Sequence, residues 1–238
     1  MKRLDIHQKH GLLSIDERVG WPRRERSLTC ADRIEPNAFL AFHMHVVSLS
    51  GSPSLRSRSA WLLDWAQAHL APHALVAQTL SLRDFPPAAL LGADTRHAEV
   101  RSAMDAIARA DVVLVGTPIY KAAYSGLLKT FLDLLPQDAL RGKTVLPLAT
   151  GGSAAHLLAI DYALKPVLHA LGARHLLDGV FVTDAQMPAH EALGYLPDAS
   201  VVERLGRALA PLREGTDHGG GRPSGAAREP EAVAVARC

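Results

Sequence analysis

Two kinds of segment alternate along the middle of the chain. Short, continuous apolar runs rich in β-branched residues are typical of strands buried in a parallel sheet. Longer segments with apolar positions on one side are typical of surface helices. The clearest run is DVVLVGT at residues 111–117, and the clearest helical side carries Trp61, Leu62, Trp65 and Leu70.

This pattern predicts alternating strands and helices over residues 44–212. Strands are expected at residues 44–50, 74–79, 111–117, 143–150 and 180–183. Helices are expected at residues 59–70, 98–110, 125–135, 156–171 and 199–212. Pro166 is expected to kink its helix, and Pro147 is expected near the end of its strand or at an irregularity.

Such alternation builds right-handed βαβ crossovers and a parallel sheet covered by helices on both faces. We therefore predict an α/β protein with a flavodoxin-like three-layer sandwich, whose five-stranded parallel sheet has the order 2-1-3-4-5. In such sheets a ligand binds beyond the carboxyl ends of the strands, so the loops at those ends are the candidates for chemistry.

Both ends of the chain lack this pattern. Residues 1–43 carry scattered charges, no sustained period of 2 or 3.6 and no apolar core of a secretory signal. A disordered extension is expected there, with a regulatory or oligomerising arm as the alternative. Translation starting at Met44 is a further expectation. Residues 213–238 are glycine-rich without an apolar stripe, so a flexible tail is expected and residues 44–212 form the folded domain.

Composition narrows the classes of protein. The 238 residues are 48% hydrophobic and 21% charged, with a net charge of +2, which suits one α/β domain with extra length. A net charge so close to zero does not indicate binding to nucleic acid or to an anionic membrane. The apolar runs are shorter than the roughly 20 residues of a spanning helix. The two cysteines, Cys30 and Cys238, lie outside the patterned region, which argues against a disulfide framework and favours a reducing, cytoplasmic setting.

The stretch LSGSPSLRSRS, between the first predicted strand and helix, suits a phosphate. Unpaired backbone N–H groups and the positive end of the helix dipole meet there, beside the hydroxyls of Ser52, Ser57 and Ser59. Arg56 or Arg58 can add a cation. Neither G-x-x-x-x-G-K-[ST] nor G-x-G-x-x-G is present, so the single phosphate of a mononucleotide fits best. An ordinary serine-capped turn is the alternative.

Two further loops at the same predicted edge carry binding chemistry. TPIYKAAYSG follows the third strand, and its Pro118 region can present backbone groups to a flat polar ring. TGGSAAH follows the fourth strand, and Gly151 and Gly152 let the backbone approach a ring closely because glycine lacks a Cβ atom. Plain βα turns also favour Gly, Ser and Pro, but three such loops together favour a binding site.

The motifs LSGSPS-x-x-SRS, GTPIYKAAYSGLLKTFLDLLP and LPLATGGSAAHLLAIDYALKPVLHALGA resemble the NADPH-dependent FMN reductases of two-component alkanesulfonate monooxygenase systems. The resemblance covers about residues 44–183. It implies a flavodoxin-like FMN reductase domain that uses FMN and NADPH, with NADH as the alternative. It also implies that reduced FMN passes to a partner flavin-dependent monooxygenase in sulfonate-sulfur utilisation, and that the chain is a homo-oligomer, dimer or tetramer, without nucleic acid or membrane partners.

The resemblance also assigns site residues by position. The FMN phosphate would be held by Ser52, Ser57, Arg58 and Ser59, and the isoalloxazine ring by Pro118, Ile119, Tyr120, Thr150, Gly151, Gly152 and Ser153. Many relatives have an arginine where this chain has Ser54, which makes Arg58 the better candidate for the phosphate cation. Tyr124 would be an extra helical residue that produces a π-bulge at a tetramer interface and makes flavin exchangeable. A helix-start aromatic packed against the sheet is the alternative.

Hydride transfer from nicotinamide C4 to flavin N5 needs ring stacking rather than an acid or base, since the cofactors carry the reactive electronics. The sequence shows no catalytic triad, and its 12 histidines form no convincing metal-ligand spacing. His156 either contacts ligand or has a helix-start role. Two rival functions stay open: an FMN-retaining quinone or azo-compound reductase, and a flavodoxin-like electron carrier, which 24 acidic against 26 basic residues disfavours.

Overall fold

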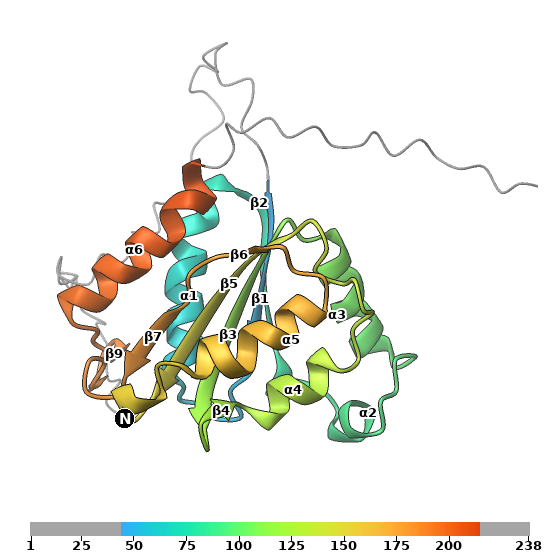
Figure 1. Cartoon of the computed structure of the whole chain (residues 1–238), viewed down its shortest axis with the longest axis horizontal. Helices are drawn as coiled ribbons and strands as arrows, with labels where there is room; N and C mark the ends of the chain where they lie inside the picture. The colour runs from blue at the N-terminus through green and yellow to red at the C-terminus, as the bar shows by residue number, and fades with distance from the viewer. Residues whose placement is uncertain (1–43, 215–238) are drawn as a thin grey trace, which may run out of the picture.

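The computed structural model describes residues 44–214, which contain every predicted strand and helix (Figure 1). The expectations for residues 1–43 and 215–238 lie outside the described part of the chain. The strands are β1 (Met44–Ser50), β2 (Ala74–Ser81), β3 (Val112–Tyr120), β4 (Ala123–Tyr124), β5 (Thr144–Gly151), β6 (His175–Leu176), β7 (Val180–Thr183), β8 (Ala189–His190) and β9 (Gly194–Tyr195). The helices are α1 (Arg58–Leu70), α2 (Pro87–Leu91), α3 (Ala98–Arg109), α4 (Gly126–Leu132), α5 (Lys165–Ala170) and α6 (Ala199–Glu214).

The main sheet confirms the predicted topology. Its long strands lie in the order β2-β1-β3-β5-β7, all parallel, which is the predicted 2-1-3-4-5 order. The two-residue strand β6 pairs with the start of β5, before β7 pairs with its end. Pro147 lies between these two stretches of pairing, so its missing N–H removes no ladder hydrogen bond on that side.

Helices cover both faces of the sheet (Figure 1). Helices α1 and α6 cover one face, where the cluster around Trp65, Leu114 and Leu205 is buried. Helices α3, α4 and α5 cover the other, around Val113 and Phe131. This is the three-layer flavodoxin-like sandwich that the alternating pattern predicts.

The expected helix at residues 156–171 is wrong as one continuous element. Residues Ala154–His156 form a 3-10 turn, Ile160–Leu164 form a π-helical turn, and α5 begins only at Lys165. Pro166 occupies the first turn of α5 and cannot donate a backbone hydrogen bond, so the α-helical ladder does not run through it. At the position where a kink is expected, the chain therefore changes from a π-helical turn to the α-helix α5.

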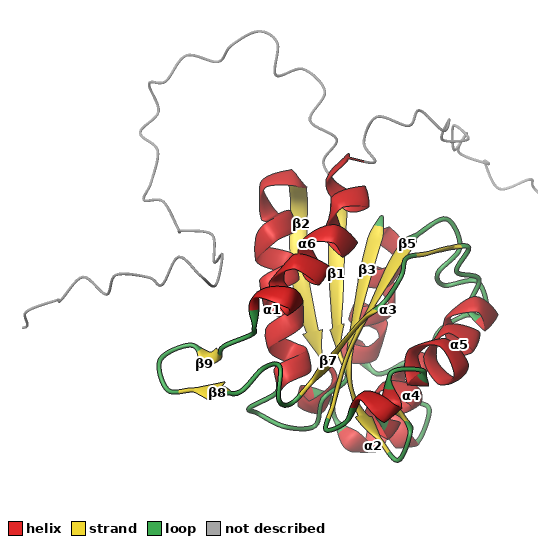
Figure 2. Cartoon of the chain, turned by 60° about the vertical axis from the view of Figure 1, so that its left-hand side comes forward, coloured by secondary structure: helices red, strands yellow, loops and turns green. Residues whose placement is uncertain are grey.

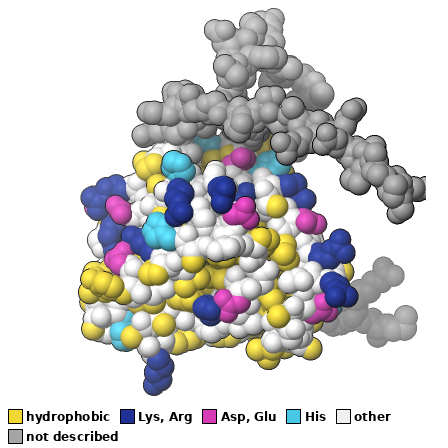
Figure 3. All heavy atoms as spheres, turned by 45° about the vertical axis from the view of Figure 1, so that its right-hand side comes forward, with side chains coloured by type: hydrophobic (Ala, Val, Ile, Leu, Met, Phe, Trp, Pro, Cys, Tyr) yellow, Lys and Arg dark blue, Asp and Glu magenta, His cyan; other side chains and the backbone are white. Residues whose placement is uncertain are grey.

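The carboxyl ends of β1, β3, β5 and β7 meet at one end of the sheet. Figure 2 shows the β8–β9 hairpin at this end, projecting beside α1. On the face seen in Figure 3, Lys and Arg side chains are interspersed with Asp and Glu, so that face carries no continuous basic surface. Within residues 44–214, no helix is long and apolar enough to cross a membrane.

Candidate functional site

The loop between β1 and α1, residues 51–57, is held close to the sheet. The Gly51 N–H donates to the Gly116 carbonyl oxygen at 2.8 Å. Ser52 is buried, and its Oγ accepts a hydrogen bond from the Ser54 N–H at 3.2 Å. Ser57 is the N-cap of α1, since its Oγ accepts from the Ala60 N–H at 3.2 Å. The first loop therefore forms the serine-rich helix N-terminus that the sequence predicts.

The end of β3 turns back on itself before α4 begins. Lys121 and Ala122 have φ values of +49° and +63°, and this turn pairs Ile119 with Tyr124 in an antiparallel strand pair. The Tyr120 side chain is half exposed at the tip. The turn therefore leaves an aromatic ring and a proline-containing strand end at the same edge as the first loop.

The third segment follows β5. The Asp184 N–H donates to the Gly151 carbonyl oxygen at 3.0 Å, which ties the end of β5 to the end of β7. A Cβ atom on Gly151 would lie 3.1 Å from Phe181 Cζ, whereas one on Gly152 would meet nothing within 4 Å. Gly151 is therefore needed for packing, and Gly152 faces open space.

These three segments, together with Asp184 and Tyr195, line one open cavity of about 240 Å³. It brings together nine of the twelve predicted site residues, Ser52, Ser57, Arg58, Pro118, Ile119, Tyr120, Thr150, Gly151 and Gly152. The lining is polar at the Ser52 and Ser57 end, where two guanidinium groups also lie, and more apolar along Pro118 and Ile119. A phosphate suits the first end and a flat ring the second.

Three predicted residues lie outside this lining. Ser59 is buried behind it, and its Oγ shares a 3.0 Å hydrogen bond with the Ser57 Oγ. Ser153 Oγ accepts from the Ala155 N–H at 3.2 Å and caps the following 3-10 turn. Tyr124 lies beyond Ile119. Ser59 and Ser153 thus support the residues that line the cavity.

The expected π-bulge at Tyr124 is wrong. Tyr124 belongs to β4, and Ser125 is the N-cap of α4, so the helix begins after this tyrosine. The positive φ values of Lys121 and Ala122 close a hairpin here instead of a helical turn. The π-helical turn of the structure is Ile160–Leu164, and Ile160 packs in the same small cluster as Tyr124. Burial raises the pKa of the Tyr124 phenol, with Lys129 opposing this and Asp133 adding to it, so the phenol is protonated at neutral pH.

Four lining residues were missed by the sequence analysis as site residues: Ser54, Arg56, Asp184 and Tyr195. Asp184 directly follows the last strand of the sheet, so the rule that ligands bind at the carboxyl ends of strands could have found it. Tyr195 lies in the β8–β9 hairpin, which has no periodic signal. Arg56 is one of the two arginines that the first loop offers as a phosphate cation, and the resemblance favours the other, Arg58.

The Arg58 guanidinium is engaged by residues far along the chain. Its Nε donates to the Met187 carbonyl oxygen at 2.8 Å, and its Nη1 lies 3.3 Å from Asp184 Oδ1. The guanidinium carbon also lies 5.0 Å from the centre of the Tyr195 ring. Arg56, by contrast, is exposed and forms no ion pair with another residue of the described range 44–214.

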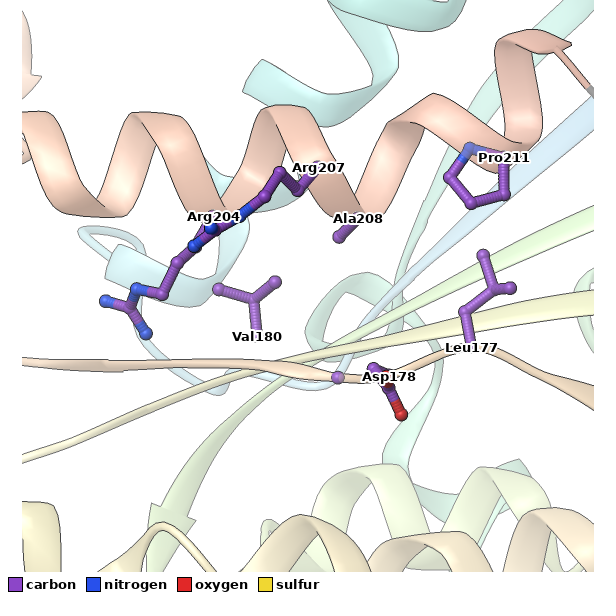
Figure 4. Close-up of a pocket in the computed structure, with 8 residues that line it drawn as sticks. Leu177, Asp178, Val180, Arg204, Arg207, Ala208 and Pro211 are labelled. Carbon is purple, nitrogen blue, oxygen red and sulfur yellow. The ribbon is translucent and has the colours of Figure 1, made fainter.

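A second groove, of about 410 Å³, lies between α6 and the start of β7 (Figure 4). Arg204 Nη1 donates to the Phe181 carbonyl oxygen at 2.6 Å, and Arg207 pairs with Glu203 at 3.5 Å. This groove lies at the opposite end of β7 from Asp184, so it is separate from the candidate site. Within residues 44–214, no group of three or more His, Cys, Asp or Glu side chains is arranged to hold a metal ion.

Comparison with known proteins agrees with this geometry. A family model described as "NADPH-dependent FMN reductase" matches residues 44–187. "FMN reductase (NADPH)" of Pseudomonas putida is 52% identical over 144 residues, 60% of this chain and 73% of the relative. "NADH-dependent FMN reductase SfnF" of Pseudomonas fluorescens is 34% identical over 62% of this chain and 81% of its own length. The apo crystal structure of an NADH:FMN oxidoreductase (EMOB) superposes with a TM-score of 0.66 at 43% identity, covering 72% of this chain and 89% of that one.

Proposed function

This chain belongs to the NADPH-dependent FMN reductase family, and we propose that it reduces free FMN for a separate flavin-dependent monooxygenase. It is an NAD(P)H-dependent FMN reductase, so FMN and a reduced nicotinamide nucleotide are its cofactors. The resemblance of its motifs to reductases of alkanesulfonate systems supports a partner monooxygenase that acts on a sulfonate. A cytoplasmic location is part of the same proposal.

One observation carries the proposal for the site: the three loops at the carboxyl ends of β1, β3 and β5 line a single cavity. Its volume of about 240 Å³ is below the roughly 300 Å³ at which typical ligand pockets begin. A cavity of that size encloses only part of a flavin nucleotide, so the rest of a bound FMN would lie outside it.

The polar end of the cavity suits the FMN phosphate. Ser52 and Ser57 lie there with the positive end of the α1 dipole, and Ser59 holds the Ser57 hydroxyl from behind. Arg56 and Arg58 are the guanidinium groups of this lining. The serine hydroxyls thus provide uncharged hydrogen-bond donors for the phosphate, and one arginine provides the positive charge.

The other end of the cavity suits the isoalloxazine ring. Pro118, Ile119 and Tyr120 lie along one side, and Thr150, Gly151 and Gly152 along the other. Ser153 supports the second side through its cap of the next turn. Flavin and nicotinamide supply the hydride chemistry when bound, and the chain's task is to hold the rings at stacking distance.

We also propose that the protein is a homo-oligomer. Leu157, Leu158 and Tyr162 expose half or more of their side chains, and they lie on the segment between the third loop and α5. Tyr120, next to the cavity, is also half exposed. Contact between copies would cover these apolar side chains beside the site.

The test is an assay of flavin dependence. Purified protein should be largely colourless after gel filtration, and it should oxidise NADPH only when free FMN is added. Parallel assays with NADH determine the nicotinamide preference. Stoichiometric flavin that survives dilution, together with ping-pong kinetics with a quinone, would instead show an FMN-retaining quinone reductase.

A further inference from the structure

The β8–β9 hairpin has few contacts of its own to hold it in place. It contains two residue pairs, Ala189 with Tyr195 and His190 with Gly194, and most of residues 188–194 are exposed. An isolated two-stranded hairpin is marginal in water. It also lies beyond residues 44–187, the range that the family model matches. Its place beside α1 (Figure 2) therefore depends on contacts with the rest of the domain.

The first turn of α1 makes those contacts. Arg58 donates to the Met187 carbonyl oxygen at 2.8 Å, pairs with Asp184 at 3.3 Å and lies over the Tyr195 ring. Trp61, one turn along, donates from Nε1 to the Leu193 carbonyl oxygen at 3.2 Å. One guanidinium group thus contacts the residue after β7, the backbone before β8 and the ring of β9.

Two of the residues that Arg58 contacts also line the nucleotide cavity. Asp184 and Tyr195 line it together with Arg58 and the first-loop serines. Loss of the guanidinium would remove the hydrogen bond to Met187, the ion pair with Asp184 and the contact with the Tyr195 ring. The wall that carries Tyr195 would then keep the Trp61 hydrogen bond, the pairing within the hairpin and the packing of Tyr195 and Leu196 against the core, but it would lose every polar contact with Arg58.

We propose that Arg58 is a positioning residue, which holds Asp184 and the Tyr195 ring as one wall of the flavin cavity. Arg56, the other arginine of the lining, binds the phosphate itself. Arg58 already uses its Nε and Nη1 groups on the chain, and its face lies on the Tyr195 ring. Arg56 is exposed at the same end of the cavity. This inference rests on the proposed function only in taking FMN as the ligand.

The first test compares FMN with riboflavin, which lacks the phosphate, as substrates of the purified protein. Arg58→Ala should raise KM for both flavins by a similar factor, between about threefold and thirtyfold, because a wall common to both is lost. Arg56→Ala should raise KM for FMN alone. Arg207→Ala removes one positive charge outside the cavity and is the control. A rise in KM for FMN alone in Arg58→Ala would overturn the proposal.

A double-mutant cycle separates the contact with Tyr195 from a general loss of folding. Tyr195→Ala lies on the hairpin itself and should reproduce much of the Arg58→Ala effect. The double variant should be little worse than either single variant, because both remove the same attachment. Additive effects on KM for riboflavin would contradict the proposal.

A third test needs no activity and so does not depend on the proposed function. Glu191 lies in the exposed turn of the hairpin, between β8 and β9. Cleavage after Glu191 by a glutamate-specific protease should be faster in Arg58→Ala than in the unchanged protein, because a detached hairpin opens more often. Arg56→Ala should leave the rate unchanged. Equal cleavage rates in all three proteins would overturn the positioning role even if FMN reduction is confirmed.

Discussion

The Ser125 hydroxyl donates a hydrogen bond to the Gly51 carbonyl oxygen, 74 positions earlier in the chain. The same hydroxyl accepts from the Leu128 N–H at 3.1 Å and so caps α4. The Ser125 N–H donates to Thr117 Oγ1 at 3.0 Å. One buried serine therefore joins the loop after β1, the end of β3 and the start of α4, and sets the spacing between the two ends of the cavity.

Ser125→Ala should destabilise the domain by about 1–3 kcal/mol, because it removes an N-cap and leaves the buried Gly51 carbonyl without this donor. It should also raise KM for FMN, since the first loop can then shift away from β3. Urea denaturation and steady-state kinetics measure the two effects. Ser102→Ala, at an exposed position of α3, is the control. A loss of stability without a change in KM would show that Ser125 does not position the site.

Two glycines of the loops should respond differently to the same change. A Cβ atom on Gly51 would lie 2.7 Å from Leu128 Cβ, so Gly51→Ala should lower the melting temperature clearly. A Cβ atom on Gly152 would meet nothing within 4 Å, so Gly152→Ala should fold with an unchanged melting temperature. Because Gly152 lines the cavity, the same variant should bind FMN more weakly. Titration of FMN by flavin fluorescence tests this, and unchanged affinity would remove Gly152 from the site.

Substitution of Tyr124 tests whether this side chain affects the binding and exchange of flavin. Its ring packs with Ile119 and Ile160 behind the cavity wall. In Tyr124→Ala the truncated side chain leaves space behind Ile119, so the wall can move away from the flavin and we expect weaker FMN binding and a higher KM for free FMN. Tyr124→Phe keeps the ring and should behave like the unchanged protein. Identical affinity and rate in the alanine variant would exclude a role in exchange.

Lys143 provides a pH test of stability. Its Nζ donates to the Ala108 and Ala110 carbonyl oxygens at 2.8 Å each, and burial lowers its pKa, which Asp111 partly offsets. Between the lowered pKa and the unfolded value of about 10.5, the unfolded chain binds more protons than the folded one. The contribution of Lys143 to the unfolding free energy should therefore rise with pH through that window.

Comparison with Lys143→Met isolates this effect. The difference in unfolding free energy between the two proteins, measured by urea denaturation, should be constant at neutral pH and should shift in favour of Lys143 as the pH approaches 10.5. A difference that stays constant over the whole range would contradict the lowered pKa.

A chain that begins at Met44 tests the proposed division into domains. All the strands and helices predicted from the sequence, and the residues that line the cavity, lie within residues 44–214. We therefore expect this shorter chain to keep the full FMN reductase activity and the same oligomeric state by gel filtration. Loss of either property would show that residues 1–43 contribute to the working protein.

The strands were predicted well because each is a local run of apolar residues. The predicted bounds of β1 and β7 agree with the structure, and the flavodoxin-like order predicted for about five alternating strands is confirmed. The helix at residues 156–171 was not predicted correctly. Ile160, the first residue of the π turn, packs in one cluster with Phe181 and Tyr124, and no local pattern describes such contacts between distant segments.

The sequence by itself determined which loops meet at the carboxyl edge of the sheet, and the resemblance of its motifs to FMN reductases assigned nine of the residues that line the cavity. This is possible because a parallel sheet places the ends of its strands together whatever the loops contain. Only the tertiary structure decided which partner Arg58 takes. The Met187 carbonyl oxygen lies 129 positions away in the chain, and Asp184 and Tyr195 reach the same guanidinium through the fold. A side chain with several donors takes the acceptors that packing brings within reach, so its role depends on distances in space rather than on spacing along the chain.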